Sequence, residues 1–149
     1  MTSKAQVDAF TAQGKLAVVG VSRSGGKFGW AIYNEMKQKG YTMYAVNRQG
    51  GEVQGVPLYA SIAALPEKVD GVIVVVPPKE TPDVLRDAAA AGVHSVWLQQ
   101  GSESPEAKAL CDQLGLDAVT GECILMFAGQ AGFHKFHRWF KGLFGGLPK

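Results

Sequence analysis

The chain has 149 residues, of which 46% are hydrophobic and 19% charged, and its formal net charge at pH 7 is +2. This composition is typical of one globular domain with a sizeable core and excludes a disordered chain. The small net charge favours neither nucleic acid nor a membrane as a partner. No apolar run approaches the roughly 20 residues of a membrane helix, and the first residues lack the apolar centre of a secretory signal. A cytoplasmic location is therefore expected.

Basic residues gather at the end of the chain. Residues 133–149 carry four basic and no acidic side chains, whereas residues 1–132 carry 11 basic and 13 acidic ones. We therefore divide the chain into a domain, 1–132, and a basic amphipathic tail, 133–149. Phe133, Phe136 and Phe140 recur at helical spacing, so we expect the tail to dock on its own domain. A dimer contact or an anionic membrane surface are the alternatives, and the oligomeric state is not indicated.

The chain begins with a predicted helix over residues 4–13, in which Val7 and Phe10 share one face. We expect this helix to pack beside the first strand. That strand is predicted by the apolar run 16–21, which is typical of a parallel strand covered on both faces. A glycine-rich turn follows it, and a second helix then continues to Gly40, a candidate C′ residue.

The middle of the chain predicts two further strands. Aromatic and branched residues over 41–47 indicate the second strand, which ends in a polar cluster. Residues 52–66 are punctuated by glycine and proline and are interpreted as a connection with a one-turn helix at 61–65. Five branched apolar residues in a row, 72–76, are the strongest buried-strand signal in the sequence.

The last part of the domain alternates between helix and strand. Thr81, which precedes a proline, is predicted to cap a third helix. A fourth strand is expected over 93–98. Ser104 is predicted to cap the next helix, which runs to Gly115 and is followed by a fifth strand over 116–119.

Strand and helix alternate about five times with short links. This pattern predicts an α/β fold, a single-domain Rossmann-like open parallel sheet of about five strands with helices on both faces. In open sheets of this type, ligands bind outside the carboxyl ends of the strands. Here those ends lie in the turns 20–27, 47–51, 77–79 and 99–102.

The turn after the first strand has the composition of an anion-binding loop. Small residues allow main-chain N–H groups to approach a phosphate, glycine permits positive φ, and the following helix contributes its positive dipole end. The turn also contains two hydroxyls and two cations. Its candidate residues are Ser22, Arg23, Ser24, Gly25, Gly26 and Lys27.

Three better-known loop motifs do not fit this turn. In the nucleotide-triphosphatase motif, Gly26 occupies the lysine position and no hydroxyl follows Lys27. In the dinucleotide fingerprint, Ser22 replaces the second glycine, although Gly25 stands at the third. A nucleophile elbow lacks its closing glycine, because Ser24 occupies that position.

Several segments together resemble a known family. These segments are VVGVSRSGGKFG, GYTMYAVN, VIVVVPP, VWLQQGS and GECILM. The chain resembles the small stand-alone CoA-binding proteins, whose domain is similar to the nucleotide-binding N-terminal domain of the succinyl-CoA synthetase α subunit. The resemblance covers roughly residues 10–130 and implies coenzyme A or an acyl-CoA as the ligand.

The resemblance also implies which residues contact CoA. They are Val21, Ser22, Arg23, Ser24, Asn47, Arg48, Pro77, Pro78, Leu98 and Gln99. Gly25 and Lys27 join this set from the composition of the turn. One position departs from the family, because Arg48 stands where a proline usually follows the asparagine.

The resemblance implies binding without catalysis, since the phosphorylated histidine of the synthetase lies in a second domain that this chain is too short to contain. An NADP-binding oxidoreductase-like protein is the alternative, and an interaction scaffold without a ligand is a third reading. Asn47 and Arg48 argue against NAD, because NAD proteins place Asp or Glu at the end of the second strand. They do not argue against NADP, whose 2′-phosphate suits the same arginine.

The remaining reactive side chains are expected to be structural. His94 begins a strand, away from the ligand turns, and the other two histidines lie in the tail. Cys111 and Cys123 are too few for a disulfide framework and lack metal-ligand spacing, so buried thiols and no metal site are expected. A mixed disulfide between Cys123 and CoA is the alternative role for that thiol.

Overall fold

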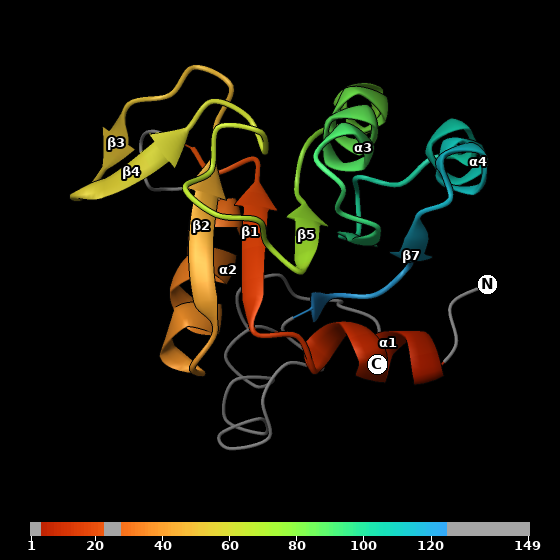
Figure 1. The fold of residues 1–149 in the computed structure, drawn as a ribbon, viewed down its shortest axis with the longest axis horizontal. Coiled ribbons are helices and arrows are strands. Elements are labelled where there is room, and N and C mark those ends of the chain that lie inside the picture. Colours follow the sequence, from red (N-terminus) through yellow and green to blue (C-terminus); the bar gives the residue numbers. More distant parts are fainter. Residues whose placement is uncertain (1–3, 23–27, 125–149) are drawn as a thin grey trace.

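The computed structural model describes residues 4–22 and 28–124 as a sheet between two layers of helices (Figure 1). The helices in these ranges are α1 (Lys4–Thr11), α2 (Phe28–Gln38), the short 3-10 helix η1 (Pro78–Glu80), α3 (Thr81–Ala90) and α4 (Pro105–Leu114). The strands are β1 (Lys15–Val19), β2 (Thr42–Val46), β3 (Glu52–Val53), β4 (Val56–Tyr59), β5 (Gly71–Val74), β6 (Ser95–Leu98) and β7 (Asp117–Val119). The five predicted strands correspond to β1, β2, β5, β6 and β7.

The sheet has the strand order β3-β4-β2-β1-β5-β6-β7, and all neighbours are parallel except β3 and β4. From β1 the chain builds outward through β2 to β4, and it then crosses back to form β5, β6 and β7 on the other side of β1. The strand order therefore reverses between β1 and β5, the position at which open sheets bind ligands. The predicted Rossmann-like α/β fold is confirmed.

The prediction for residues 52–66 is wrong, and the sheet has two more strands than expected. β4 extends the parallel sheet by pairing with β2, and β3 adds an antiparallel edge. Pro57 lies within β4, where a proline argues against a strand unless the strand is near an edge. The predicted helix at 61–65 is also absent from this described segment, whose backbone forms turn bonds such as Ala64 N–H to the Ser61 carbonyl at 3.2 Å.

The helices cover opposite faces of the sheet. Leu16 and Val18 of β1 lie in the core beneath α1 and α2, whereas Ala17 and Val19 lie beneath α3 and α4. This alternation follows from the two-residue period of a strand. The expected position of α1 is corrected, because it packs mainly across β6 and β7. There Phe10 meets Trp97 edge to face, with ring centroids 5.3 Å apart.

Three helices end in the same way. Each is followed by a glycine of positive φ that lets the chain turn back toward the sheet: Gly40 (102°), Gly92 (79°) and Gly115 (70°). At each end the N–H groups of this glycine and of the residue after it bond to carbonyls of the last turn of the helix, as in a Schellman motif. Ser104 caps α4 as predicted, since its side chain accepts a 3.0 Å bond from Ala107 N–H.

The predicted cap of α3 is wrong. Thr81 is the first residue of the helix, and Glu80 occupies the cap position without a side-chain cap bond. The Thr81 hydroxyl instead donates a 2.6 Å bond to the Ser102 carbonyl, and both residues are buried. A buried carbonyl needs a partner, so tertiary contact outweighs the local capping preference of threonine.

Candidate functional site

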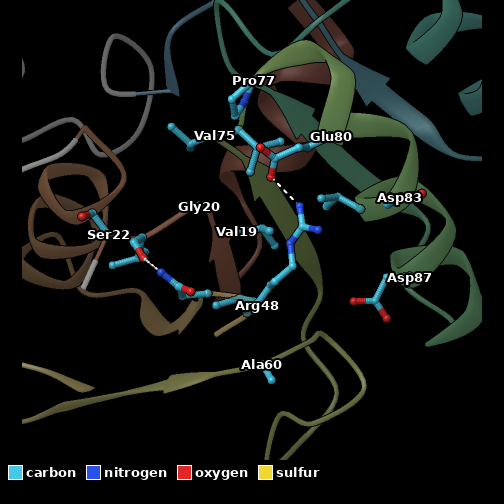
Figure 2. Close-up of a pocket in the computed structure, with 15 residues that line it drawn as sticks. Val19, Gly20, Ser22, Arg48, Ala60, Val75, Pro77, Glu80, Asp83 and Asp87 are labelled. Atoms are coloured by element: carbon cyan, nitrogen blue, oxygen red, sulfur yellow. Dashed lines mark hydrogen bonds and ion pairs between the residues drawn. The ribbon is translucent and has the colours of Figure 1, made fainter. Parts of the chain in front are cut away.

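A cavity of about 350 Å³ opens at the carboxyl ends of β1, β2 and β5. Its lining combines apolar side chains, such as Val19, Val46 and Val75, with polar ones, of which Figure 2 labels Ser22, Arg48, Glu80, Asp83 and Asp87. The cavity coincides with the reversal of strand order. Of the residues predicted to contact a ligand, the structure brings together five here: Val21, Ser22, Asn47, Arg48 and Pro77.

The turn after β1 depends on close backbone packing at Gly20. Gly20 has φ of +115°, and a Cβ there would lie 2.1 Å from the Val75 carbonyl oxygen. Gly29 in the first turn of α2 is also confined, because its Cβ would lie 2.6 Å from the Gly20 carbonyl oxygen. Such contact between helix and turn is the role of the third glycine in dinucleotide folds. Sequence spacing pointed to Gly25 for that position and missed Gly29, whose signal was a glycine inside an amphipathic helix.

Asn47 holds two of the ligand turns together. Its side-chain NH₂ donates a 2.8 Å bond to the Val21 carbonyl, and its side-chain oxygen accepts a 2.8 Å bond from Gln49 N–H. The N–H groups of Gly20 and Val21 both bond to the Val46 carbonyl, at 3.0 and 3.2 Å. The end of β2 is thereby tied to the turn after β1, with Ser22 at the cavity wall.

Arg48 follows Asn47 at the end of β2 and also lines the cavity. Its guanidinium forms an ion pair with Glu80, with 2.7 Å between Nη2 and Oε1, and Figure 2 shows the side chain reaching from the end of β2 toward Glu80. Asp83 and Asp87 of α3 also line this wall. Among the described lining residues, Arg48 carries the one positive charge beside three carboxylates.

The turn after β5 is held by the turn after β6. The Ser102 hydroxyl donates to the Val76 carbonyl at 2.7 Å and accepts from Val76 N–H at 3.0 Å. These two bonds fix the backbone directly before Pro77, and Pro78 follows as an exposed residue at the start of η1. Pro77 lines the cavity, and Pro78 does not.

Leu98 and Gln99 lie in the interior and do not line the cavity described here. Leu98 is 0% exposed and Gln99 is 1% exposed. The Gln99 side-chain oxygen accepts a 3.0 Å bond from Ile124 N–H, so this side chain tethers the segment after β7. Arg23, Ser24, Gly25 and Lys27 lie outside the described residues, as does the tail 133–149.

The sequence of residues 14–128 matches the model of the CoA-binding domain family. This chain belongs to that family. The match covers most of the chain, and it includes every described residue of the cavity wall.

Relatives of this CoA-binding domain include subunits of ligases. It is 37% identical over 87 residues to the α subunit of ADP-forming acetate–CoA ligase I from Pyrococcus furiosus, covering 54% of this chain and 19% of that protein. It is 29% identical over 121 residues to ADP-forming acetate–CoA ligase I from Archaeoglobus fulgidus, covering 74% and 18%. The chain thus spans about a fifth of the length of these ligases.

Solved structures resemble the CoA-binding domain over nearly their full length. A conserved hypothetical protein from Pyrococcus furiosus has 35% identity and a TM-score of 0.69, with 74% of this chain and 96% of that chain covered. A hypothetical protein from Pyrococcus horikoshii OT3 has 25% identity and a TM-score of 0.76, with 93% of each chain covered.

The other reactive groups of the CoA-binding domain lie apart from the cavity. Cys111 and Cys123 are buried, as predicted, and burial raises the pKa of the Cys111 thiol to about 11. His94 is exposed immediately before β6, at the amino end of that strand. Across the described residues, no three His, Cys, Asp or Glu side chains cluster as metal ligands, and no helix is long and apolar enough to cross a membrane.

Proposed function

We propose that this protein binds coenzyme A or an acyl-CoA in the cavity at the ends of β1, β2 and β5. The observation that carries the proposal is the pairing, across one cavity, of a glycine-dependent turn at Gly20 with the cation Arg48. A close-packed main-chain turn suits a pyrophosphate, and an arginine suits a phosphate on the neighbouring ribose. Membership of the CoA-binding domain family supports CoA over other nucleotides.

The pyrophosphate is proposed to lie against Val21 and Ser22, with Arg23, Ser24, Gly25 and Lys27 completing the turn in the sequence. Asn47 supports this turn through its bond to the Val21 carbonyl, and Arg48 receives the phosphate on the ribose. Pro77 and Pro78 flank the cavity on the β5 side. Leu98 and Gln99 lie behind that wall, so their proposed part is to support the turn that contains Ser102.

The proposal assigns binding and no reaction to these residues. The relatives are ligases of which this chain spans about a fifth, so the shared region corresponds to one part of a larger catalytic protein. A protein of this kind is suited to sense, store or present its ligand.

Calorimetric titration with CoA and dephospho-CoA tests the proposal. A hydrogen bond to a charged group is worth roughly 1.5 to 3 kcal/mol, and less where water screens it, so the ribose phosphate should contribute on the order of tenfold in affinity. The parent protein should bind CoA more tightly than dephospho-CoA. Arg48→Ala should bind the two about equally, because the partner of the phosphate is gone.

Arg86→Ala is the matched control, since Arg86 is an arginine on α3 that pairs with Asp83 and does not line the cavity. It should keep the preference for CoA. Tighter binding of NADP than of CoA to the parent protein would contradict the proposal and favour the oxidoreductase-like alternative.

A further inference from the structure

Glu80 occupies the position on Arg48 that a ligand phosphate would take. The two side chains come from different parts of the chain, one after β2 and one before α3, and their bond of 2.7 Å lies at the wall of the cavity (Figure 2). The side chain of Arg48 is 69% exposed and that of Glu80 is 33% exposed. An ion pair this accessible to water is weak, so another anion can replace its carboxylate.

The carboxylate of Glu80 is not used to build the helix that it precedes. Glu80 stands at the cap position of α3, but its side chain makes no cap bond. The start of α3 is held instead by Thr81, whose hydroxyl bonds to the buried Ser102 carbonyl. A change at Glu80 should therefore alter Arg48 and the cavity while leaving the fold intact.

The other two carboxylates of this wall have different partners. Asp83 pairs with Arg86 at 3.1 Å, on the exposed side of α3. Asp87 accepts a 2.9 Å bond from Ile62 N–H and so holds the segment after β4, which contributes Ala60 to the cavity. Glu80 is the carboxylate of the three that contacts Arg48 directly.

We propose that Glu80 is a specificity-determining residue that competes with a phosphate on the ligand ribose for Arg48. This inference rests on the proposed function. A ligand with that phosphate must displace the carboxylate and then remain beside its negative charge, whereas a ligand without the phosphate leaves the ion pair undisturbed. Glu80 therefore reduces the difference in affinity between CoA and dephospho-CoA. It acts as a repulsive group that disfavours only the ligand with the phosphate.

The test is calorimetric titration of Glu80→Gln with CoA and with dephospho-CoA. Glutamine keeps the size of the side chain and removes its charge, so Arg48 is released for the phosphate. CoA should bind about three- to tenfold more tightly than to the parent protein, the range expected for relief from a partly exposed charge competitor. The affinity for dephospho-CoA should stay within about twofold of the parent value, because it has no phosphate at that position.

Two carboxylates provide matched controls. Asp83→Asn removes one negative charge from the same wall without touching Arg48, and it should raise CoA affinity less than Glu80→Gln does. Asp8→Asn removes an equally negative but remote charge on α1, where Asp8 pairs with Lys4, and it should leave both affinities unchanged. In the double variant Arg48→Ala with Glu80→Gln, the gain for CoA should disappear.

The outcomes separate the two proposals. If the parent protein binds CoA but Glu80→Gln and Glu80→Ala do not widen its preference over dephospho-CoA, the role of Glu80 is refuted and the proposed function stands. An equal gain from Glu80→Gln and Asp83→Asn also refutes it, since a general field effect then suffices. If the parent binds neither nucleotide, both proposals fail. Melting temperatures measured alongside show that each variant is folded.

Discussion

The turns after β2 and β6 occupy equivalent places in the fold, yet they differ in what they do. Both follow a parallel strand at the carboxyl edge of the sheet, and both were predicted to contact CoA. Asn47 and Arg48 after β2 line the cavity, whereas Leu98 and Gln99 after β6 are buried. Position at the carboxyl edge is therefore insufficient to place a residue at the cavity, whose lining residues lie beside the reversal of strand order.

The physical cause of this difference is what covers each turn. Both β2 and β6 have a parallel neighbour on each side, but only at β6 does the segment after β7 pack over the end of the strand. Trp97 donates a 3.1 Å bond to the Glu122 carbonyl, and Gln99 accepts one from Ile124 N–H. At β2 the chain passes on to the edge strands, which leaves Arg48 open to solvent and to the cavity.

The largest expected effect is a loss of stability when a glycine is replaced by alanine, compared between the turn after β1 at the cavity and the turn after β6. Gly20→Ala should lower the free energy of unfolding by about 3 kcal/mol or more, because positive φ and a close backbone contact both oppose a Cβ. Gly101, in the turn after β6, also has positive φ, at 94°, but no atom lies within 4 Å of its added Cβ. Gly101→Ala should therefore cost only about 1 kcal/mol, from backbone strain alone. Urea unfolding of the two variants measures both values, and equal losses would contradict the role given to close packing at Gly20.

The next largest effects are on stability and CoA affinity when the amide side chain at the end of β2 or of β6 is removed. Asn47→Ala should reduce stability by about 1 to 2 kcal/mol and should also weaken CoA binding several-fold, because the turn after β1 loses its tie to β2. Gln99→Ala should reduce stability by a similar amount, about 1 to 3 kcal/mol, since it leaves a buried N–H without its partner. Its affinity for CoA should fall less than that of Asn47→Ala, because Gln99 supports the turn that contains Ser102 and does not line the cavity.

These two variants are best measured together, by urea unfolding and by calorimetric titration at a temperature where both are folded. A loss of CoA affinity in Gln99→Ala as large as that in Asn47→Ala would show that the buried turn contributes directly to binding, which would remove the distinction between the two regions.

The smallest expected effect is on the reactivity of the two thiols, which are buried like the turn after β6. Cys123 is 3% exposed and Cys111 is 2% exposed. Since burial raises the pKa of Cys111 to about 11, its reactive thiolate is scarce at pH 8. The native protein incubated with CoA disulfide at pH 8 should keep its intact mass, and both thiols should react after unfolding in urea. Rapid formation of a mixed disulfide on Cys123 in the native protein would place that residue at an open site.

Much of the fold could be predicted from local patterns. The apolar run 72–76 predicted a buried central strand, and β5 is buried at all its positions. Ser104 and Gly115 bound α4 as expected, because caps depend on local geometry. β3 and β4 could not be predicted, since Gly55 and Pro57 interrupt the local strand pattern. These short strands form because β4 pairs with β2 and β3 pairs with β4. The cap at Thr81 was wrong for a related reason, because its hydroxyl bonds to a carbonyl 21 residues away.

The sequence by itself determined the layered α/β architecture, the turns at the ends of the strands and the glycine-dependent turn after β1, because these follow from hydrophobic period and backbone freedom within a few residues. Only the tertiary structure decided which turns meet at the cavity, that Gly29 packs on Gly20, and that Arg48 is already paired with Glu80. Each of these depends on residues far apart in the chain. Their approach is set by strand order and by side-chain packing, which local sequence patterns do not specify.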